Sequence, residues 1–473
     1  MLQATANWLA ANAKFEKSLV YYIVIDGYYR SFYSCPNFAL LTNPLADVGD
    51  PWLVSIDEHD KNINDMEGGA DQEKFCFTVQ DRNNLITADM GAGTVFEGSL
   101  VQVYVGFTSL TSTSDYLLYW QGYVDQVDSA NSNTEYYFQC SDVTTKLQQT
   151  VYLIGDNGGQ TSGNNIKTLT GHPLAMMLDI LQNQLRDPIT GQALNPALID
   201  VAKITEYMTG PFDGMEFLFH LSQPPAALDF IKNQLLKPLG GYLWVSQGKL
   251  TVNFFYPLGT PTPVQNIGQN DWLSIPTAEQ TQMINTVVYQ FDKDDGDGSS
   301  SGNYLSSNTQ QYGPSVSRYG LFGELNINAD GMRAALQGYL ISWLVSYLIF
   351  GRYGFKNLTF DQNAAEGLMS LWLLEPGDIV SVTHSKIPNR STGVMGITNF
   401  PFELLNKKTN FEKCIVTLTM IDATYLSKFG FAEITPDGEP AYTSASSGDK
   451  LIYMWQSGSS GKYSNGDPGK VLG

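Results

Sequence analysis

The sequence predicts a mainly β protein, in which two antiparallel β-barrel domains flank a small α+β domain and a polar tail ends the chain. Short runs rich in β-branched and aromatic residues follow one another at close spacing from 75 to 152 and again from 283 to 425. Between them, helical spacing of apolar residues takes over. The expected segments are 1–155 (first β domain), 156–265 (α+β insertion), 266–428 (second β domain) and 429–473 (tail).

The first β domain is expected to open with a hairpin. Two runs of β-branched and aromatic residues flank Asp26-Gly27 within residues 18–32. Asp-Gly in that position indicates a two-residue type I′ turn, because both of its central residues need a positive φ. Residues 36–71 then lose all periodicity and collect Pro, Asn, Asp and Gly, so we expect a loop insertion there.

The α+β insertion is predicted to hold two helices and a hairpin. Residues 156–165 form a break rich in Gly and Asn, and the apolar residues of 172–185 then recur at helical spacing. A second helix begins near Pro224 and ends at Gly240, which matches the usual start and stop signals. Two short strands around Gln247-Gly248 follow.

The second β domain is interrupted by an acidic loop, 292–303, and by a long apolar helix, 332–350. The most hydrophobic part of that helix, 336–350, is shorter than the roughly 20 residues that a membrane span needs. It is therefore predicted to be a buried helix, and no stable membrane insertion is expected. The amino terminus lacks the features of a signal peptide. In the tail, LIYMWQ at 451–456 is the one apolar run, which we interpret as an anchor onto a neighbour.

The composition favours a protein that is packed against other subunits. Charged residues make up 16% of the chain, against about 25% in a typical soluble domain. The net charge is −20, and the closest approach to a basic cluster is Lys407-Lys408. Since affinity for nucleic acid depends on neutralising phosphates, specific DNA binding is not expected. An acidic wall would let DNA slide past without sticking.

The residues that carry chemistry are few, and no catalytic, cofactor-binding or metal-binding residue is predicted. There is no G-x-S-x-G motif and no phosphate-binding loop. The histidines are predicted to be ordinary structural residues. His172, which precedes a proline, is expected to cap or pack at a helix start. The cysteines have no C-x-x-C spacing and read as free thiols, although convergence on a metal cluster stays open. The histidines are His59, His172, His220 and His384, and the cysteines are Cys35, Cys76, Cys140 and Cys414.

Calcium binding by the acidic loop also stays open, beside the simpler interpretation as a solvated turn. Asp292, Asp294, Asp295 and Asp297 offer the oxygen ligands that calcium prefers. The EF-hand pattern fails here, because its sixth position is Asp297 rather than glycine and its twelfth is Asn303 rather than glutamate.

A sugar-binding platform is the other open alternative. Tyr116, Tyr119 and Trp120 stand along one strand, where aromatic residues either stack on sugars or fill a core or a subunit interface. Two of the 47 acidic residues facing each other would suit glycoside cleavage, but the sequence singles out no pair.

Three stretches of the chain resemble phage tail hub proteins and together cover about half of it. LEPGDIVSVTH (374–384), followed by GVMGITNFPFELL and KCIVTLTMID, is similar to the closing segment of that family. Residues 99–149 look like the early barrel of these hubs, and residues 225–252 resemble a helix that leads to a two-strand unit in them. The chain stops in a short polar tail, whereas longer members continue into fibre-binding modules.

The resemblance implies two tail-tube-like β domains and a non-enzymatic role in the virion. Three copies would form a ring whose six β domains match the six-fold tail tube, with DNA passing through without specific binding. The expected partners are tail tube or distal tail proteins, the tape measure protein and tip fibre or spike proteins, at the tail tip, during DNA ejection and host cell entry. Two alternatives remain: a carbohydrate-binding or carbohydrate-cleaving tail spike, and another structural tail-tip or distal ring protein.

Overall fold

The structure of the chain is a computed structural model. It describes residues 2–14, 18–34, 49–64, 69–70, 72–152, 167–186, 193–255, 263–274, 277–279, 283–294, 304–354, 362–367, 371–389 and 393–423. The tail at 424–473, with its apolar run, lies outside the described residues.

The prediction of a mainly β protein with an α+β part is confirmed. The strands are Leu19–Ile25 (β1), Ser31–Tyr33 (β2), Leu53–Ile56 (β3), His59–Asn64 (β4), Gly69–Ala70 (β5), Lys74–Gln80 (β6), Leu100–Phe107 (β7), Leu117–Ala130 (β8), Glu135–Ser141 (β9), Lys167–Gly171 (β10), Phe217–Leu221 (β11), Gly241–Ser246 (β12), Lys249–Phe254 (β13), Gln265–Ile267 (β14), Thr277–Glu279 (β15), Thr286–Lys293 (β16), Tyr304–Gln311 (β17), Glu324–Ala329 (β18), Gln362–Gly367 (β19), Ile379–Asn389 (β20), Val394–Asn410 (β21) and Ile415–Asp422 (β22). The helices are Ala6–Asn12 (α1), Leu85–Gly91 (α2), Pro173–Asp179 (α3), Val201–Thr209 (α4), Ala227–Asp229 (α5), Gly313–Tyr319 (α6) and Ala335–Tyr353 (α7).

Seven antiparallel strands form the first sheet, in the order β2-β1-β7-β8-β9-β6-β3. Its inward side chains alternate along β6 and β7, as a half-buried strand requires. Among the described residues the sheet does not close into a barrel of continuous ladders. A single parallel bridge between Phe32 and Asp50 joins its two edges instead.

The hairpin predicted around Asp26-Gly27 is present, but the prediction of a two-residue turn is wrong. β1 pairs with β2, and five residues, 26–30, connect them instead of two. Gly27 has a positive φ of 75°, whereas Asp26 does not. The loop is longer because Tyr28 is drawn out of the strand: its ring packs 4.9 Å from that of Phe96 and its hydroxyl donates to Asp89.

The expected loop over residues 36–71 is wrong for its second half, which carries β3, β4 and β5. β4 has the sequence HDKNIN, which reads as loop because it is polar. Its inward positions His59 and Lys61 are nevertheless buried, because partners elsewhere in the chain satisfy them. Residues 35–48 lie outside the described residues.

The predicted elements of the α+β part are confirmed. His172 caps α3, with its Nδ1 accepting from the backbone N–H of Leu174 at 3.1 Å. The second helical segment begins at Ala227 and ends at Gly240, whose φ of 67° is the left-handed conformation typical of a helix stop. β12 and β13 then pair around Gln247 and Gly248, both of which have positive φ.

Residues 266–428 divide between two different sheets. β17-β16-β18 form a three-stranded sheet, which α7 covers on one side, and this unit packs into the same hydrophobic cluster as the α+β part. The later strands join a ten-stranded second sheet, in the order β13-β12-β5-β4-β21-β22-β19-β15, with β20 and β14 branching from β21. The centre of this second sheet shares a separate hydrophobic cluster with the first sheet.

The long apolar helix is confirmed as α7, but the expectation that it is buried holds only for part of it. Residues from Val345 to Tyr353 lie mostly in the core, whereas side chains in its first half are exposed. None of the helices in the described part of the chain is long and apolar enough to cross a membrane.

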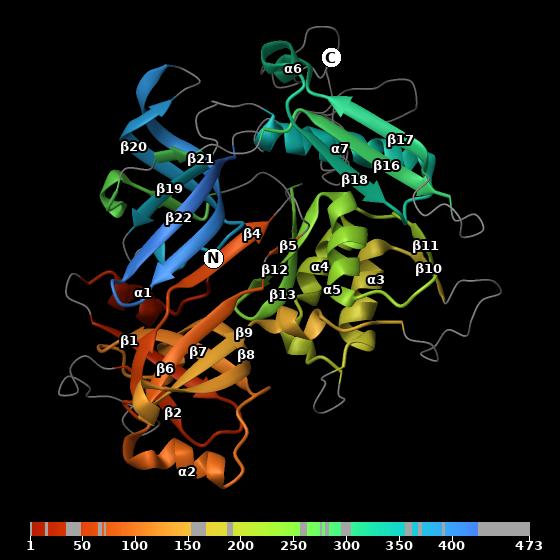
Figure 1. The fold of residues 1–473 in the computed structure, drawn as a ribbon. Coiled ribbons are helices and arrows are strands. Elements are labelled where there is room, and N and C mark those ends of the chain that lie inside the picture. The colour runs from red at the N-terminus through yellow and green to blue at the C-terminus, as the bar shows by residue number, and fades with distance from the viewer. Residues whose placement is uncertain are drawn as a thin grey trace.

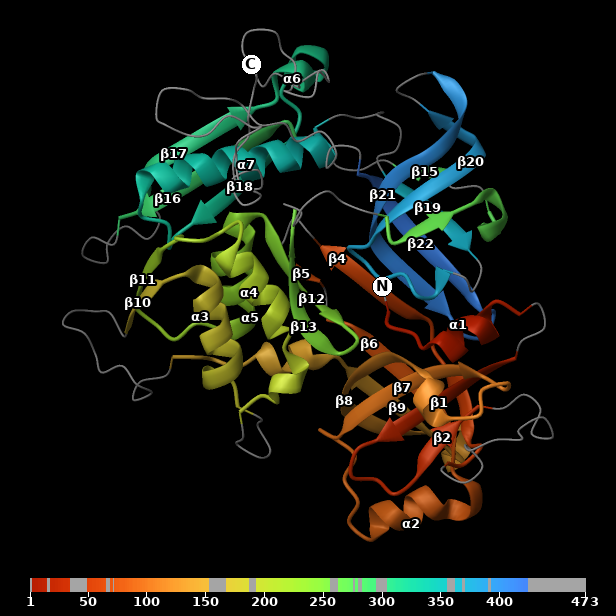
Figure 2. The ribbon, with the colours of Figure 1, turned by 180° about the vertical axis from the view of Figure 1, so that it is seen from behind.

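Figure 1 shows how these parts are arranged. The first sheet lies at one end of the molecule, with the central strands β21 and β22 of the second sheet beyond it, and β4 runs between the two. The α+β part lies beside this pair, next to the three-stranded sheet and α7. The view from behind agrees and shows β4 and β5 leading from the blue strands to the green hairpin β12–β13 (Figure 2).

Candidate functional site

The least expected feature of the molecule is a group of charged side chains buried where the first and second sheets meet. We call His59, Lys61, Glu73, Glu375 and Lys407 the ionic junction. None of these residues is more than 4% exposed. His59 and Lys61 come from β4, Lys407 from β21, Glu73 from the residue before β6, and Glu375 from the turn before β20. The junction therefore joins strands from both sheets.

Two lysines of the junction lie directly opposite each other. β4 pairs with β21 in antiparallel register, and Lys61 stands across from Lys407. Like charges in that position destabilise a sheet. The structure gives the two lysines different partners: Lys61 Nζ lies 3.2 Å from Glu375 Oε1 and 3.7 Å from Glu73 Oε2. Lys407 donates instead to the backbone carbonyl of Trp372.

The two lysines accordingly differ in charge. Burial alone would lower the pKa of Lys61, but Glu73 and Glu375 raise it above its ordinary value. Burial, with Lys61 opposite, lowers the pKa of Lys407 to about 7. One lysine of the pair therefore keeps its proton across the physiological range, while the other gives up its proton near neutral pH.

The pKa values of the acids beside Lys61 are also shifted. Burial raises the pKa of Glu73 to about 8 although Lys61 opposes the shift. Burial likewise raises the pKa of Asp142 to about 6, and that carboxylate accepts from the backbone N–H of Glu73 at 3.0 Å. His59 Nε2 lies 3.6 Å from Glu73 Oε2, but burial and the two lysines hold the pKa of His59 well below its usual range. His59 is therefore neutral.

Hydroxyl groups and aromatic rings complete the junction. Tyr119 Oη donates to Thr409 Oγ1 at 2.8 Å and lies 3.2 Å from His59 Nδ1. Ser246 Oγ donates to Glu375 Oε2 at 2.6 Å, which links the hairpin β12–β13 to the same carboxylate. The rings of Tyr119 and Trp372 surround the charged groups, with centroids 6.0 Å apart. Three parts of the fold thus meet on one set of polar contacts.

A second buried pair lies farther along the second sheet. The guanidinium of Arg352, at the end of α7, donates to Glu403 Oε2 of β21 at 2.5 Å, and its carbon lies 4.8 Å from the ring centroid of Phe255. The pair ties the three-stranded unit to the second sheet. Breaking a buried ion pair usually costs about 3–5 kcal/mol, since the remaining charge has no partner.

The ionic junction is suited to a structural role. Its groups are closed off from solvent, so a substrate has no path to them. No group of three or more His, Cys, Asp or Glu residues within the described part of the chain is arranged to hold a metal ion. What the arrangement does is fix the register of β4 against β21 and the position of the turn before β20.

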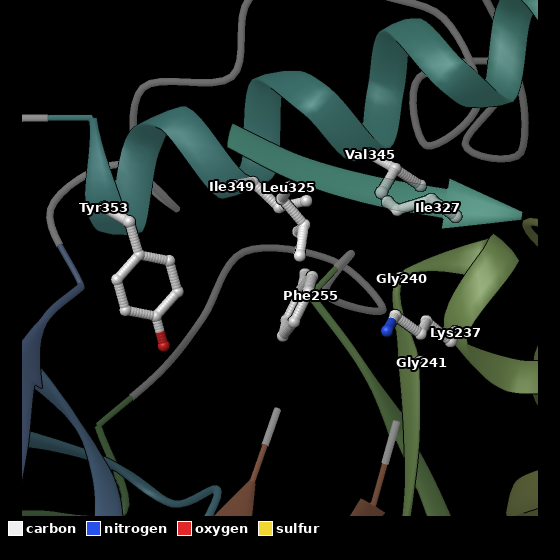
Figure 3. A pocket seen from close by; sticks show the side chains of 9 residues that line it. All are labelled: Lys237, Gly240, Gly241, Phe255, Leu325, Ile327, Val345, Ile349 and Tyr353. Atoms are coloured by element: carbon white, nitrogen blue, oxygen red, sulfur yellow. The ribbon is translucent and has the colours of Figure 1, made fainter. Parts of the chain in front are cut away.

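One small pocket opens between α7, β18 and the turn at Gly240 and Gly241. Figure 3 shows that apolar side chains line it from both sides, with the Lys237 side chain at one end and the Tyr353 ring at the other. It has no carboxylate among its lining residues and therefore no pair of acids for hydrolysis. The lining residues are Lys237, Gly240, Gly241, Phe255, Leu325, Ile327, Val345, Ile349 and Tyr353.

In the acidic stretch, Asp292 belongs to β16 and Asp294 follows it directly, while Asp295 and Asp297 lie outside the described residues. Cys76, Cys140 and Cys414 are free thiols, and Cys35 is not among the described residues. The sugar platform is wrong for its three residues, because Tyr116, Tyr119 and Trp120 are all buried.

The remaining histidines are structural in their contacts. His220 lies on β11, with Nδ1 3.2 Å from the hydroxyl of Thr168. His384 lies within β20, which continues past it to Asn389, and accepts from the backbone N–H of Lys386 at 3.1 Å. His59 alone enters a charged cluster, as the junction shows.

The junction was missed because its residues look like loop and surface residues. A signal was present: His59, Lys61 and Ile63 alternate along β4, and Leu405, Lys407 and Thr409 alternate along β21. In both strands the polar and apolar members of the alternating set are buried together.

Comparison with known proteins finds similarity among solved structures alone. No family model matches the chain, and no curated protein sequence matches it. A 43 kDa tail protein of a prophage of Shewanella oneidensis is 10% identical, with 86% of this chain and 99% of that chain covered and a TM-score of 0.46. A tail protein from Neisseria meningitidis is 10% identical, with 86% and 98% covered and a TM-score of 0.44. A prophage tail protein from Listeria monocytogenes is 11% identical, with 77% and 87% covered and a TM-score of 0.40.

Proposed function

We propose that the chain is a structural, non-enzymatic hub protein of a bacteriophage tail tip. Three copies form a ring that joins the six-fold tail tube to three-fold tip components and encloses the DNA channel. The observation that carries the proposal is the presence, within one chain, of two β sheets that share one hydrophobic cluster. With two β modules in each chain, three chains supply six.

The ionic junction supports this role. A closed ring holds only if the angle between neighbouring modules is fixed, since heterologous contacts that do not close generate open filaments. A buried ion pair that joins two elements favours the arrangement that keeps them together, because parting them leaves a buried charge without its partner. Lys61 of β4, in the second sheet, pairs in this way with Glu73, which directly precedes β6 of the first sheet, so the junction would set the angle between the two modules of each chain.

Composition and sequence resemblance support it as well. The chain is poor in charge, which suits surfaces that are covered in an assembly, and its net charge of −20 suits a channel to which DNA does not stick. The stretches that resemble tail hubs fall on β7 to β9, on β12 and β13, and on β20 to β22. The proposed partners are tail tube or distal tail proteins, the tape measure protein and tip fibre or spike proteins.

The test is to locate and count the chain in particles that contain it. A small epitope inserted after Asn131, in the exposed β8–β9 turn, would mark each copy for antibody labelling and symmetry-resolved electron microscopy. We expect three labels at the tail tip. Six copies would make the chain a distal ring protein, and labels along a side fibre with cleavage of host polysaccharide would make it a spike; either result overturns the hub assignment.

A further inference from the structure

The first half of α7 presents an apolar face to solvent. Leu336, Tyr339, Leu340 and Trp343 are 74%, 47%, 57% and 41% exposed. They stand at positions i, i+3, i+4 and i+7, so they lie on one side of the helix over two turns. The side opposite packs on the three-stranded sheet, and Tyr339, at the edge of the exposed face, reaches that sheet with its ring 5.1 Å from the ring of Phe291.

This helix lacks the polar outer face that a surface helix normally has. From Ala335 to Gly351 it carries no charged residue, and Arg352 is the first. A helix that is apolar on all sides is usually covered on all sides. The second half of α7 fits that rule, because residues from Val345 onward are buried in the core. Within the part of the chain that the structure describes, the exposed face of the first half is thus the part of the helix without a cover.

The size of the face favours a short segment over a whole subunit. Eight residues of α-helix rise by about 10 Å. A stable contact between two globular subunits needs about 800 Å² and 20–30 residues from each. Four side chains fall far below that. They match the scale at which a short apolar segment binds a helix face through a few large anchors, among which Trp and Tyr contribute most.

We propose that this face binds the apolar segment Leu451–Gln456 of the chain itself. LIYMWQ is the one apolar run in the polar tail, and it offers five large apolar side chains in succession with no charge. The face on α7 is equally free of charge, so contact between them buries no unpaired ion. The inference stands independently of the proposed function.

The place where the described chain ends agrees with this. β22 ends at Asp422, and Ala423 is buried in the same hydrophobic cluster as the second half of α7. Residues 424–450 then span at most roughly 90 Å when extended. That length is ample to reach the face on α7 of the same copy.

Hydroxyl-radical footprinting of the intact chain tests the proposal, because the aromatic side chains of the face are themselves reactive probes. Oxidation of Tyr339 and Trp343 should be at least threefold lower in the full chain than in a chain that ends at Ala423. Tyr29 is exposed in the loop between β1 and β2, two strands that lie far from α7 (Figure 1), and it should react equally in both. Equal oxidation of Tyr339 and Trp343 in the two chains would overturn the proposal.

Matched variants separate the segment from the rest of the tail. In the full chain, the double change Tyr453→Ser and Trp455→Ser should restore the reactivity of Trp343 to that of the shortened chain. Tyr463→Ser, in the same tail but outside the segment, should leave it unchanged. A synthetic peptide of residues 447–460 added to the shortened chain should protect Trp343 again, and dilution of full chains distinguishes binding within one copy from binding between copies.

The remaining outcome concerns a second copy of the chain. Leu340→Asp should release the segment without changing the oligomeric state. Leu305→Asp, which alters another exposed leucine, on β17, should neither release the segment nor change the oligomeric state. If Leu340→Asp instead dissociates an assembly that the shortened chain still forms, the face belongs to a subunit interface and the proposal fails.

Discussion

The ionic junction and the exposed face of α7 are opposite exceptions to the usual distribution of residues. In the junction the molecule buries two lysines, two glutamates and a histidine; on α7 it exposes a tryptophan, a tyrosine and two leucines. Buried charge is tolerated where each ion has a partner, and exposed apolar side chains gather where a partner molecule or segment binds.

The two regions should contribute to different properties, the first to the stability of the fold and the second to association. In the junction the partners are already present within the chain: Glu375 and Glu73 for Lys61, and the Trp372 carbonyl for Lys407. That region should govern the stability of the folded chain. The face on α7 has no such contacts on its outer side among the described residues, so it should matter little for folding and much for association. Changes in the two regions should therefore separate into two classes.

The largest effect is expected from Lys61→Met. It leaves the buried carboxylate of Glu375 without its cation, and such a loss costs about 3–5 kcal/mol of unfolding free energy. Lys407→Met is the matched control on the opposite strand. It removes a lysine whose pKa is already lowered to about 7 and leaves the Trp372 carbonyl without its donor. An unpaired buried carbonyl costs about 1–3 kcal/mol of unfolding free energy. Part of that cost is offset, because the variant no longer buries the charged form of the lysine.

Denaturant unfolding of both variants at pH 7.5 measures this difference. Equal losses of unfolding free energy would mean that the two lysines are equivalent, which contradicts the asymmetric pairing in the junction.

The next effect is a dependence on pH that Glu73→Gln should remove. Because burial raises the pKa of Glu73 from 4.5 to about 8 in the folded chain, the folded state binds the extra proton between those values. The contribution of Glu73 to stability is complete below pH 4.5 and is lost as pH rises toward 8. Relative to the glutamine variant, the wild type should lose about 1.4 kcal/mol per pH unit in this window.

Unfolding free energies of both proteins at pH 5, 6, 7 and 8 give the test. Lys407 titrates in the same range and Glu73 raises its pKa, so both proteins are measured in a Lys407→Met background. Two parallel curves would contradict the shift at Glu73.

A smaller effect is expected from Tyr119→Phe. The hydroxyl donates to Thr409 at 2.8 Å inside the junction, and losing one buried hydrogen bond costs about 1 kcal/mol. A double-mutant cycle with Thr409→Val should return a coupling of 0.5 kcal/mol or more, on the order expected for side chains in contact. Additive losses would show that the two hydroxyls act separately.

The smallest effect on folding is expected on α7. Leu340→Ser should change the unfolding free energy of the chain that ends at Ala423 by no more than about 0.5 kcal/mol, as for a surface position. Its neighbour Ile341, which is buried, is the control: Ile341→Ala should cost about 2–5 kcal/mol. A loss at Leu340 as large as that at Ile341 would place the exposed face in the core.

The sequence predicted the features that depend on neighbouring residues. The helix stop at Gly240, the hairpin around Gln247 and Gly248 and the cap at His172 are local signals, and the structure has all of them. The turn at Asp26-Gly27 failed because Tyr28 packs against Phe96, from a distant segment.

The junction could not be predicted for the same reason. Its central pairing joins β4 to β21, so that Lys61 and Lys407 meet across most of the length of the chain. Without that partner strand, a polar segment such as His59–Asn64 has no reason to be buried. The exposed face of α7 escaped notice because an apolar helix gives no sign of which side its own chain covers.

The central claim, that two β modules in each chain allow three chains to imitate a ring of six, is tested most directly by mass. Sedimentation equilibrium of the purified full chain, over a range of concentrations, measures the assembled mass without labels. The account predicts a species three times the 52.2 kDa chain mass. A monomer at every concentration, or an assembly of six chains, would contradict it.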